Sequence, residues 1–302
     1  MALLKADDLV KRFGNMNAVK GINFYIEEGR CVSLLGPNGA GKTTTLKMLS
    51  GLLEPTSGSI DFKGKKAKDL RQFIGYLPQY PAFFNWMSGK EFLVFAGQLA
   101  KLSRKEADIR SEELLERVGL ADAKKRRIRG YSGGMKQRLG LAQALIHRPS
   151  LLILDEPVSA LDPLGRREVL DMMREIKEET TILFSTHVLH DAEEISDDIL
   201  IMHAGEIAVS GSLGSVMAEY QQPIIQVEFE SPAADWLKSI ADYGFVSEVN
   251  TQGNKASIVL KDMVEAKQKL LKDIVDLELP IRKFEVSQTT LEDLFMKVVK
   301  KS

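Results

Sequence analysis

The stretch GPNGAGKT at residues 36–43 decides the fold, because it fits the pattern G-x-x-x-x-G-K-[ST] between a predicted strand and a predicted helix. The apolar run CVSLLG (31–36) precedes it, and KTTTLKMLSGLL (42–53) follows it. Glycines in such a turn let several backbone N–H groups converge on one phosphate, since a Cβ would block the approach or the φ angle. This context predicts a phosphate-binding loop, or P-loop, in an α/β core.

The residues of this loop predict contacts with a nucleotide and with a metal ion. We expect Lys42 to bind the β- and γ-phosphates and the Thr43 hydroxyl to ligate Mg²⁺. The other predicted nucleotide-binding residues of the loop are Gly36, Asn38, Gly39, Gly41 and Thr44.

The stretch LLILDE (151–156) reads as a buried apolar strand that ends in two carboxylates. Asp155, at the carboxyl end of the strand, is predicted to hold Mg²⁺. Glu156 follows by one residue, so strand alternation would point its side chain the other way, away from a direct metal role. We therefore expect Glu156 to act as a general base that polarises a water.

Composition limits the remaining possibilities. The 302 residues are 44% hydrophobic and 27% charged, with a formal net charge of -1, which gives no global attraction to nucleic acid or anionic lipid. The single cysteine, Cys31, excludes an internal disulfide and is expected to be a small core residue. No stretch approaches the ~18 uncharged apolar residues that a membrane span needs, so we expect no membrane crossing by this chain alone.

Up to this point the motifs predict a nucleoside triphosphatase without specifying the class. A GTPase would carry a base-reading N-K-x-D loop, which this sequence lacks, and no acceptor site of a P-loop kinase is apparent. The run YSGGMKQ (131–137) decides between these classes, since it resembles the signature motif L-S-G-G-Q of ATP-binding cassette (ABC) ATPases.

Other motifs extend the resemblance over residues 1–212. Phe13 corresponds to the aromatic residue that stacks on adenine, Gln79 to the Q-loop glutamine at the metal site, and His187 to the switch histidine at the γ-phosphate. SALD (159–162), which ends in Asp162, matches the D-loop. The resemblance implies Mg²⁺-dependent ATP hydrolysis with Glu156, His187 and Lys42 as catalytic residues. It implies ATP and Mg²⁺ as cofactors, with the metal ligands Thr43, Gln79 and Asp155.

The resemblance also implies an assembly of two ATPase subunits, head to tail, as a homodimer or a heterodimer. Ser132, Gly133 and Gly134 of one chain would then close over the ATP that the P-loop of the other chain holds, with the start of the following helix adding positive charge. Two residues depart from the usual signature, Tyr131 for Leu and Met135 for Gln. Neither supplies a phosphate donor, so we expect altered packing. Phe13 replaces the more usual Tyr and keeps its stacking face.

The chain is predicted to contain two domains. Residues 1–219 fit a P-loop ABC ATPase core of class α/β, with a mixed sheet, an antiparallel β subdomain and a helical insertion at about 88–148. Residues 223–302 show the order β-α-β-β-α-β, a small α+β ferredoxin-like domain, followed by a last helix at 290–301. The linker is predicted near 219–223.

The resemblance further implies integral membrane permease subunits as partners and a peripheral location at the cytoplasmic face of the cell membrane. Aromatic residues and Met after Gln79 are candidates for the permease interface, with the helical core as the alternative: Phe83, Phe84, Trp86 and Met87. We expect Trp86 to face the partner. The basic run KKRRIR (124–129) could touch lipid or the partner, although a solvated loop is favoured.

The C-terminal region resembles the extension of drug- and antibiotic-resistance exporter ATPases, which favours export of a solute that the sequence does not identify. A dimer-bracing or regulatory role for this domain is compatible with export. Two alternatives stay open: the ATPase of an importer, and a soluble ABC ATPase that acts on ribosomes or DNA. One cassette, no heptad tract and balanced charge argue against the second alternative, so no nucleic-acid partner is expected.

Overall fold

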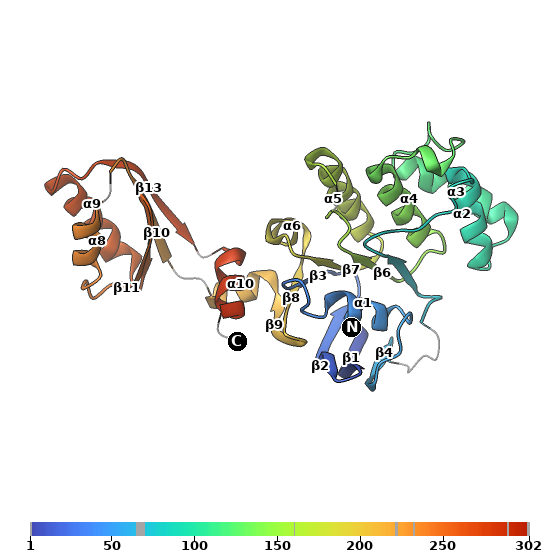
Figure 1. Cartoon of the computed structure of the whole chain (residues 1–302), viewed down its shortest axis with the longest axis horizontal. Helices are drawn as coiled ribbons and strands as arrows, with labels where there is room; N and C mark the ends of the chain where they lie inside the picture. The colour runs from blue at the N-terminus through green and yellow to red at the C-terminus, as the bar shows by residue number, and fades with distance from the viewer. Residues whose placement is uncertain are drawn as a thin grey trace. The chain divides into compact units, whose positions relative to one another are not determined.

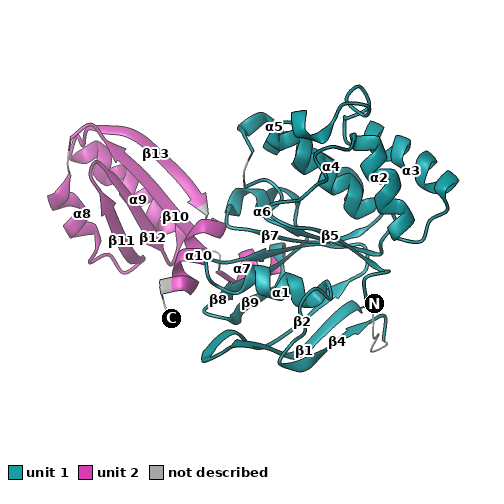
Figure 2. Cartoon of the chain, turned by 45° about the vertical axis from the view of Figure 1, so that its right-hand side comes forward, with its two compact units in different colours: residues 1–213, 302 teal, residues 214–301 magenta. Residues whose placement is uncertain are grey.

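The computed structural model describes residues 2–64, 70–159, 161–220, 223–231, 233–288 and 290–300. The chain divides into two compact units, Met1–Leu213 and Gly214–Lys301 (Figure 2). Among the described residues, the first unit contains two sheets and two buried cores, and the second unit contains one sheet and one core. None of the helices in the described ranges combines the length and the hydropathy that crossing a membrane requires.

A six-stranded sheet in the order β5-β6-β7-β3-β8-β9 forms the centre of the first unit. Its strands are β3 (Cys31–Leu35), β5 (Ile74–Leu77), β6 (Leu151–Asp155), β7 (Thr181–Thr186), β8 (Asp198–His203) and β9 (Glu206–Ser212). All pairs are parallel except β8 and β9, which form an antiparallel hairpin. Because β3, β6 and β7 are parallel neighbours, their carboxyl ends meet at one edge of the sheet.

The two faces of this sheet belong to two different cores. Leu152 and Leu154 of β6 pack into the core beneath the helices, while Leu151 and Ile153 pack into the core on the opposite face. This alternation is the two-residue period of a strand, and burial on both faces explains the continuously apolar sequence. Cys31 in β3 is 1% exposed, as predicted, and burial raises the pKa of its thiol to about 12.

An antiparallel sheet in the order β2-β1-β4 lies on one side of the central sheet, with helix α1 (Lys42–Leu49) between them (Figure 1). Its strands are β1 (Ala2–Phe13), β2 (Met16–Glu27) and β4 (Ser57–Phe62). The antiparallel subdomain is therefore confirmed. Strands β1 and β4 were not individually predicted, because charged residues interrupt β1 and register shifts with φ +46 at Asp8 break its alternation.

The helical insertion lies between β5 and β6, where every residue is described, and contains no strand. It consists of α2 (Gly89–Leu99), α3 (Arg104–Arg117), a short 3₁₀ turn η1 (Ile128–Gly130) and α4 (Gly133–Leu145). Capping boxes start α2 at Ser88 and α3 at Ser103, which explains where both helices begin. Helices α5 (Pro163–Lys177), α6 (Leu189–Ile195) and α7 (Leu213–Tyr220) follow later in the chain.

The second unit has the predicted ferredoxin-like arrangement. Its elements are β10 (Pro223–Phe229), α8 (Ala234–Ile240), β11 (Val246–Gln252), β12 (Lys255–Leu260), α9 (Met263–Asp276), β13 (Ile281–Gln288) and α10 (Leu291–Lys300). The strands form one antiparallel sheet in the order β11-β12-β10-β13, with α8 and α9 on one face (Figure 1). The predicted linker includes residues 221–222, which lie outside the described residues.

Candidate functional site

A cavity of about 480 Å³ opens beside the P-loop, at the edge of the sheet where β3 ends. Most of the nucleotide-binding residues predicted from the sequence line it. These are Phe13, Asn38, Gly39, Gly41, Lys42, Thr43, Thr44 and Gln79, and the predicted base Glu156 also lines the cavity. Parts of the chain that the sequence analysis did not assign to the site complete the wall: Met16, Asn17, Ala18, Lys20, Ala40, Ala204 and Gly205.

Two glycines explain how the backbone reaches this shape. Gly41, the N-cap of α1, has φ +106, a conformation that side chains with a Cβ rarely adopt. A Cβ on Gly36 would lie 2.3 Å from the Met202 carbonyl oxygen of β8. The loop therefore turns tightly against the neighbouring strand, and the backbone N–H groups at the start of α1 open into the cavity.

Lys42 is the first residue of α1, and it is only 7% exposed. Its Nζ donates to the carbonyl oxygens of Gly36 at 2.7 Å and Pro37 at 3.2 Å. Burial lowers the pKa of the ammonium, while the Glu156 and Asp155 carboxylates act in the opposite direction. A phosphate in this cavity would meet a cation that is already held in place and largely removed from water.

Asp155 occupies the last position of β6 and is 1% exposed. Alternate residues of a strand point to the same face of the sheet, so the Asp155 side chain lies on the face of Leu151 and Ile153, toward α1. Its Oδ1 accepts hydrogen bonds from Thr43 Oγ1 at 3.1 Å and from Ser185 Oγ at 2.7 Å. A hydroxyl and a carboxylate at this spacing are oxygen donors of the type Mg²⁺ prefers, and Gln79 supplies a third oxygen donor in the cavity wall.

Glu156 does not follow the strand alternation that the sequence predicts. Strand β6 ends at Asp155, and Glu156 has a left-handed backbone with φ +50. Its Oε1 lies 3.9 Å from Lys42 Nζ, and its Oε2 lies 2.7 Å from His187 Nδ1. The carboxylate thus lines the same cavity as the P-loop lysine. His187 is half exposed and reaches the site through this contact.

Two large apolar side chains also line the cavity. Phe13 ends β1 and is 46% exposed, and Met16, which the sequence analysis missed, is 64% exposed beside it. Lys11 Nζ lies 5.3 Å from the centre of the Phe13 ring. An exposed aromatic ring and a flexible thioether at a cavity mouth can cover a flat base. The signal that could have found Met16 is its place directly after the short turn that follows Phe13, where it pairs with Phe13.

The signature residues lie outside the residues that line this cavity. Ser132 is the N-cap of α4, where its Oγ accepts from Met135 N at 3.2 Å, and both Ser132 and Gly133 are exposed. A Cβ on Gly134 would lie 3.8 Å from Leu161 of the D-loop, so the signature and the D-loop are neighbours. Asp162 caps α5 by accepting from Gly165 N at 2.9 Å. Ala160 of the D-loop lies outside the described residues.

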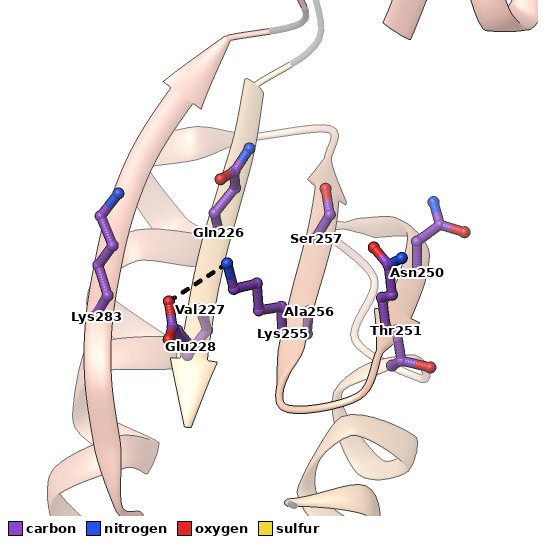
Figure 3. Close-up of a pocket in the computed structure, with 10 residues that line it drawn as sticks. Gln226, Val227, Glu228, Asn250, Thr251, Lys255, Ala256, Ser257 and Lys283 are labelled. Carbon is purple, nitrogen blue, oxygen red and sulfur yellow. Dashed lines mark ion pairs between the residues drawn. The ribbon is translucent and has the colours of Figure 1, made fainter. Parts of the chain in front are cut away.

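A second cavity, of about 460 Å³, lies on the sheet of the second unit and contains none of the predicted site residues. Figure 3 shows polar side chains that rise from β10, β11, β12 and β13 around it. Lys255 Nζ lies 3.7 Å from Glu228 Oε2 there, and Lys283 Nζ lies 2.6 Å from Glu285 Oε2. Because these charges are paired within the sheet, the P-loop cavity is the stronger candidate for chemistry.

Comparison with known proteins gives matches over both units. The sequence pattern of the family described as ABC transporter matches residues 19–159. The pattern of the C-terminal domain of DrrA1-3-like ATP-binding proteins matches residues 211–299.

Two curated relatives and one solved structure show the extent of the similarity. The chain is 49% identical over 297 residues to the uncharacterised ABC transporter ATP-binding protein YxlF of Bacillus subtilis, covering 98% of this chain and 99% of the relative. It is 32% identical over 302 residues to the linearmycin resistance ATP-binding protein LnrL of the same organism, covering 97% of this chain and 97% of the relative. The ATP-binding cassette MJ0796, solved as a dimer in a post-hydrolysis state with ADP and Pi, matches with TM-score 0.64 and 26% identity, covering 70% of this chain and 98% of that one.

Proposed function

We propose that this chain, which belongs to the family of ABC transporter ATP-binding proteins, hydrolyses ATP with Mg²⁺ to power export of a solute through separate membrane-spanning subunits. The observation that carries the catalytic part is the position of Glu156 between Lys42 and His187 in the P-loop cavity. ATP hydrolysis is a property of the family. The roles of individual residues, the metal and the direction of transport are our proposals.

Different residues of the cavity would bind different parts of ATP. Phe13 and Met16 would cover the adenine, and the start of α1 would direct its N–H groups at the β-phosphate. Lys42 would exchange its contacts with the Gly36 and Pro37 oxygens for the β- and γ-phosphates. Because the ammonium is buried, its attraction to the phosphates is screened less than at the surface.

Thr43, Asp155 and Gln79 are the residues that would hold Mg²⁺. When bound, this ion would neutralise charge that develops on the β- and γ-phosphate oxygens. The Thr43 hydroxyl can donate to Asp155 Oδ1, as it does at 3.1 Å, and still offer an oxygen lone pair to a metal. The protein therefore needs little rearrangement to accept the ion.

Glu156 would act as the general base. Its carboxylate would accept a proton from the attacking water, while the His187 ring, 2.7 Å away at Nδ1, would orient the carboxylate and reach toward the γ-phosphate. A positioned base of this type contributes about 10²–10⁴ in rate.

The test is Glu156→Gln, which keeps the shape of the side chain and removes its basicity. We expect unchanged ATP affinity, a fall in kcat of at least about 10²-fold, and a stable dimer in ATP and Mg²⁺ by light scattering. Glu179→Gln, the same chemical change at a carboxylate that is 66% exposed, is the matched control. Hydrolysis at the wild-type rate by Glu156→Gln would exclude the base assignment.

A second copy or a related chain would complete the site. The exposed start of α4, with Ser132, Gly133 and Gly134, is outside the cavity of its own chain and is available to a γ-phosphate held by another chain. The dimeric state of the relative MJ0796 supports this assembly. We propose that ATP holds the two chains together and that hydrolysis releases them.

An aromatic cluster after the Q-loop is the proposed contact with a membrane-spanning partner. Trp86 is 68% exposed and Phe84 is 49% exposed, with their ring centroids 6.2 Å apart, while Phe83 and Met87 pack against the helical core. Within this segment, Trp86 and Phe84 are therefore candidates for the interface, whereas Phe83 and Met87 belong to the helical core. Large exposed aromatic groups are typical of interface centres.

Trp86→Ala is expected to disrupt assembly with the membrane partner and to leave ATP binding by the isolated chain intact, because Trp86 lies outside the P-loop cavity. Pull-down of the permease with the tagged chain measures this. Tyr25→Ala, which removes an exposed aromatic residue elsewhere in the same unit, is the control. Equal permease recovery with both variants would count against the proposed interface.

Export is favoured over import by the second unit, which matches the DrrA-like C-terminal domain, and by the similarity to LnrL, a linearmycin resistance ATP-binding protein. We propose two domains, 1–219 and 223–302, and a peripheral location at the cytoplasmic face of the membrane.

Deletion of the gene should raise sensitivity to at least one antimicrobial compound, and a catalytically inactive Glu156→Gln copy should not restore resistance. If the deletion reduced the uptake of a nutrient and left antimicrobial sensitivity unchanged, an importer would be favoured.

A further inference from the structure

Ser185 is a polar residue in the centre of the parallel sheet, in a position with no exposure to solvent. It lies on β7 between β3 and β6, where it is the register partner of Leu34 and of Asp155. Its neighbours Phe184 and Leu183 pack into the two cores. A hydroxyl in such surroundings destabilises the fold unless it is hydrogen-bonded, so its partners indicate its role.

The Ser185 hydroxyl contacts both carboxylate residues of the site. Its Oγ donates to Asp155 Oδ1 at 2.7 Å and accepts from the backbone N–H of Glu156 at 2.9 Å. The first bond restrains the carboxylate that faces Thr43. The second bond satisfies the N–H of a residue with φ +50, a conformation that costs about 1–2 kcal/mol for a residue with a Cβ.

We propose that Ser185 is a positioning residue that sets the orientation of the metal-binding carboxylate and of the catalytic base through one hydroxyl. This inference rests on the roles proposed above for Asp155 and Glu156. Loss of the hydroxyl would let the Asp155 side chain rotate and would leave a buried N–H without a partner at the turn that directs Glu156 toward Lys42. The affinity for metal and the rate of the chemical step would then fall together, while the affinity for nucleotide without metal would stay the same.

The experiment compares Ser185→Val with Ser185→Thr in the full chain. Both variants add the same branched carbon at the same buried position, so any effect of overpacking is common to both, and only Thr keeps a hydroxyl. Mn²⁺ binding to the ADP-bound protein, followed by electron paramagnetic resonance, reports the metal site without catalysis. ADP affinity without metal and the kcat for ATP in Mg²⁺ are measured in parallel.

We expect Ser185→Val to bind Mn²⁺ about tenfold more weakly than Ser185→Thr and to hydrolyse ATP about 10- to 100-fold more slowly, with equal ADP affinities. If both variants fail to fold, Ser185→Ala against the wild type gives the same comparison without added volume. Equal Mn²⁺ affinity and equal kcat in the compared pair would overturn the proposal.

A failure of the proposed function would look different. In that case the wild type would not hydrolyse ATP, or Glu156→Gln would remain active. An active wild type and an inactive Glu156→Gln, together with equal values for Ser185→Val and Ser185→Thr, would reject only the role of Ser185.

Discussion

Glu156 shows how a single backbone angle directs a side chain into the site. Its φ of +50 ends β6 and turns the side chain back toward Lys42 and His187, whereas a continued strand would point it into the helical core. Strained residues persist where surrounding contacts hold them, and here the Ser185 hydroxyl and the His187 ring are those contacts. The strain therefore belongs to the geometry of the site.

Lys42 makes stability depend on pH in a defined direction. Burial lowers the pKa of its ammonium in the folded protein, so the folded state disfavours the charged form. Between the lowered pKa and the ordinary value of about 10.4, the unfolded chain binds the proton and the folded chain does not. The free energy of unfolding must therefore rise with pH in that window, relative to a chain without this ammonium.

The measurement is urea unfolding of the wild type and of Lys42→Met from pH 7 to pH 10. The difference in unfolding free energy should move in favour of the wild type as pH rises, by up to about 1.4 kcal/mol for each unit by which folding lowers the pKa. Other titrating groups are common to both proteins and cancel. A difference that stays constant over this range would show that Lys42 keeps its ordinary pKa.

At the scale of the elements, the tyrosine of the signature motif is accommodated by a glycine on another helix. Tyr131 is buried, and its hydroxyl donates to the Ala123 carbonyl oxygen at 2.8 Å. A Cβ on Gly89, the first residue of α2, would lie 2.3 Å from this hydroxyl. The altered packing expected for Tyr131 is thus located at the contact between η1 and α2.

Gly89→Ala should therefore destabilise the protein by about 1–3 kcal/mol, because the buried ring has to shift and its hydrogen bond to Ala123 is lost. In the Tyr131→Leu background the same change should be neutral or stabilising by up to about 1 kcal/mol, since Ala is the better helix former. A thermodynamic cycle from urea unfolding measures both steps. Equal effects of Gly89→Ala in the two backgrounds would disprove the steric link.

At the scale of the whole molecule, the two tryptophans report on different units. Trp86 is exposed in the first unit, and Trp236 is 5% exposed in the core of the second unit, in contact with Phe229. Trp86→Phe leaves Trp236 as the only tryptophan. Its emission then follows the unfolding of the second unit alone.

ATP with Mg²⁺ should stabilise only the unit that contains the P-loop cavity. At a concentration of 100 Kd, the gain is about 2.7 kcal/mol. In Trp86→Phe, we expect nucleotide to shift the main unfolding transition followed by circular dichroism and to leave the midpoint of the Trp236 emission change unmoved. An equal shift of both signals would mean that the units unfold as one.

Local sequence pattern predicted the elements on which the site is built. The Gly spacing of the P-loop, the apolar strand that ends in Asp155, the helix that begins at the signature residues and the ferredoxin-like order of the second unit are all confirmed. Strands β1 and β4 escaped prediction because bulges and charges break the two-residue period on which strand recognition depends. Met16, the first residue of β2, was missed because its link to the site is its pairing with Phe13 across the β1–β2 turn, which no apolar period marks.

What the amino-acid sequence determined by itself is the family and the candidate residues of the site, since both depend on residue types at short, fixed spacings. Only the tertiary structure decided which groups touch: Glu156 with Lys42 and His187, and Ser185 with both carboxylate residues. These contacts join residues 29 to 114 positions apart (185 minus 156, and 156 minus 42). They depend on the order of β3, β7 and β6 in the sheet and on the left-handed backbone of Glu156. Neither feature follows from the spacing of apolar residues in the local sequence.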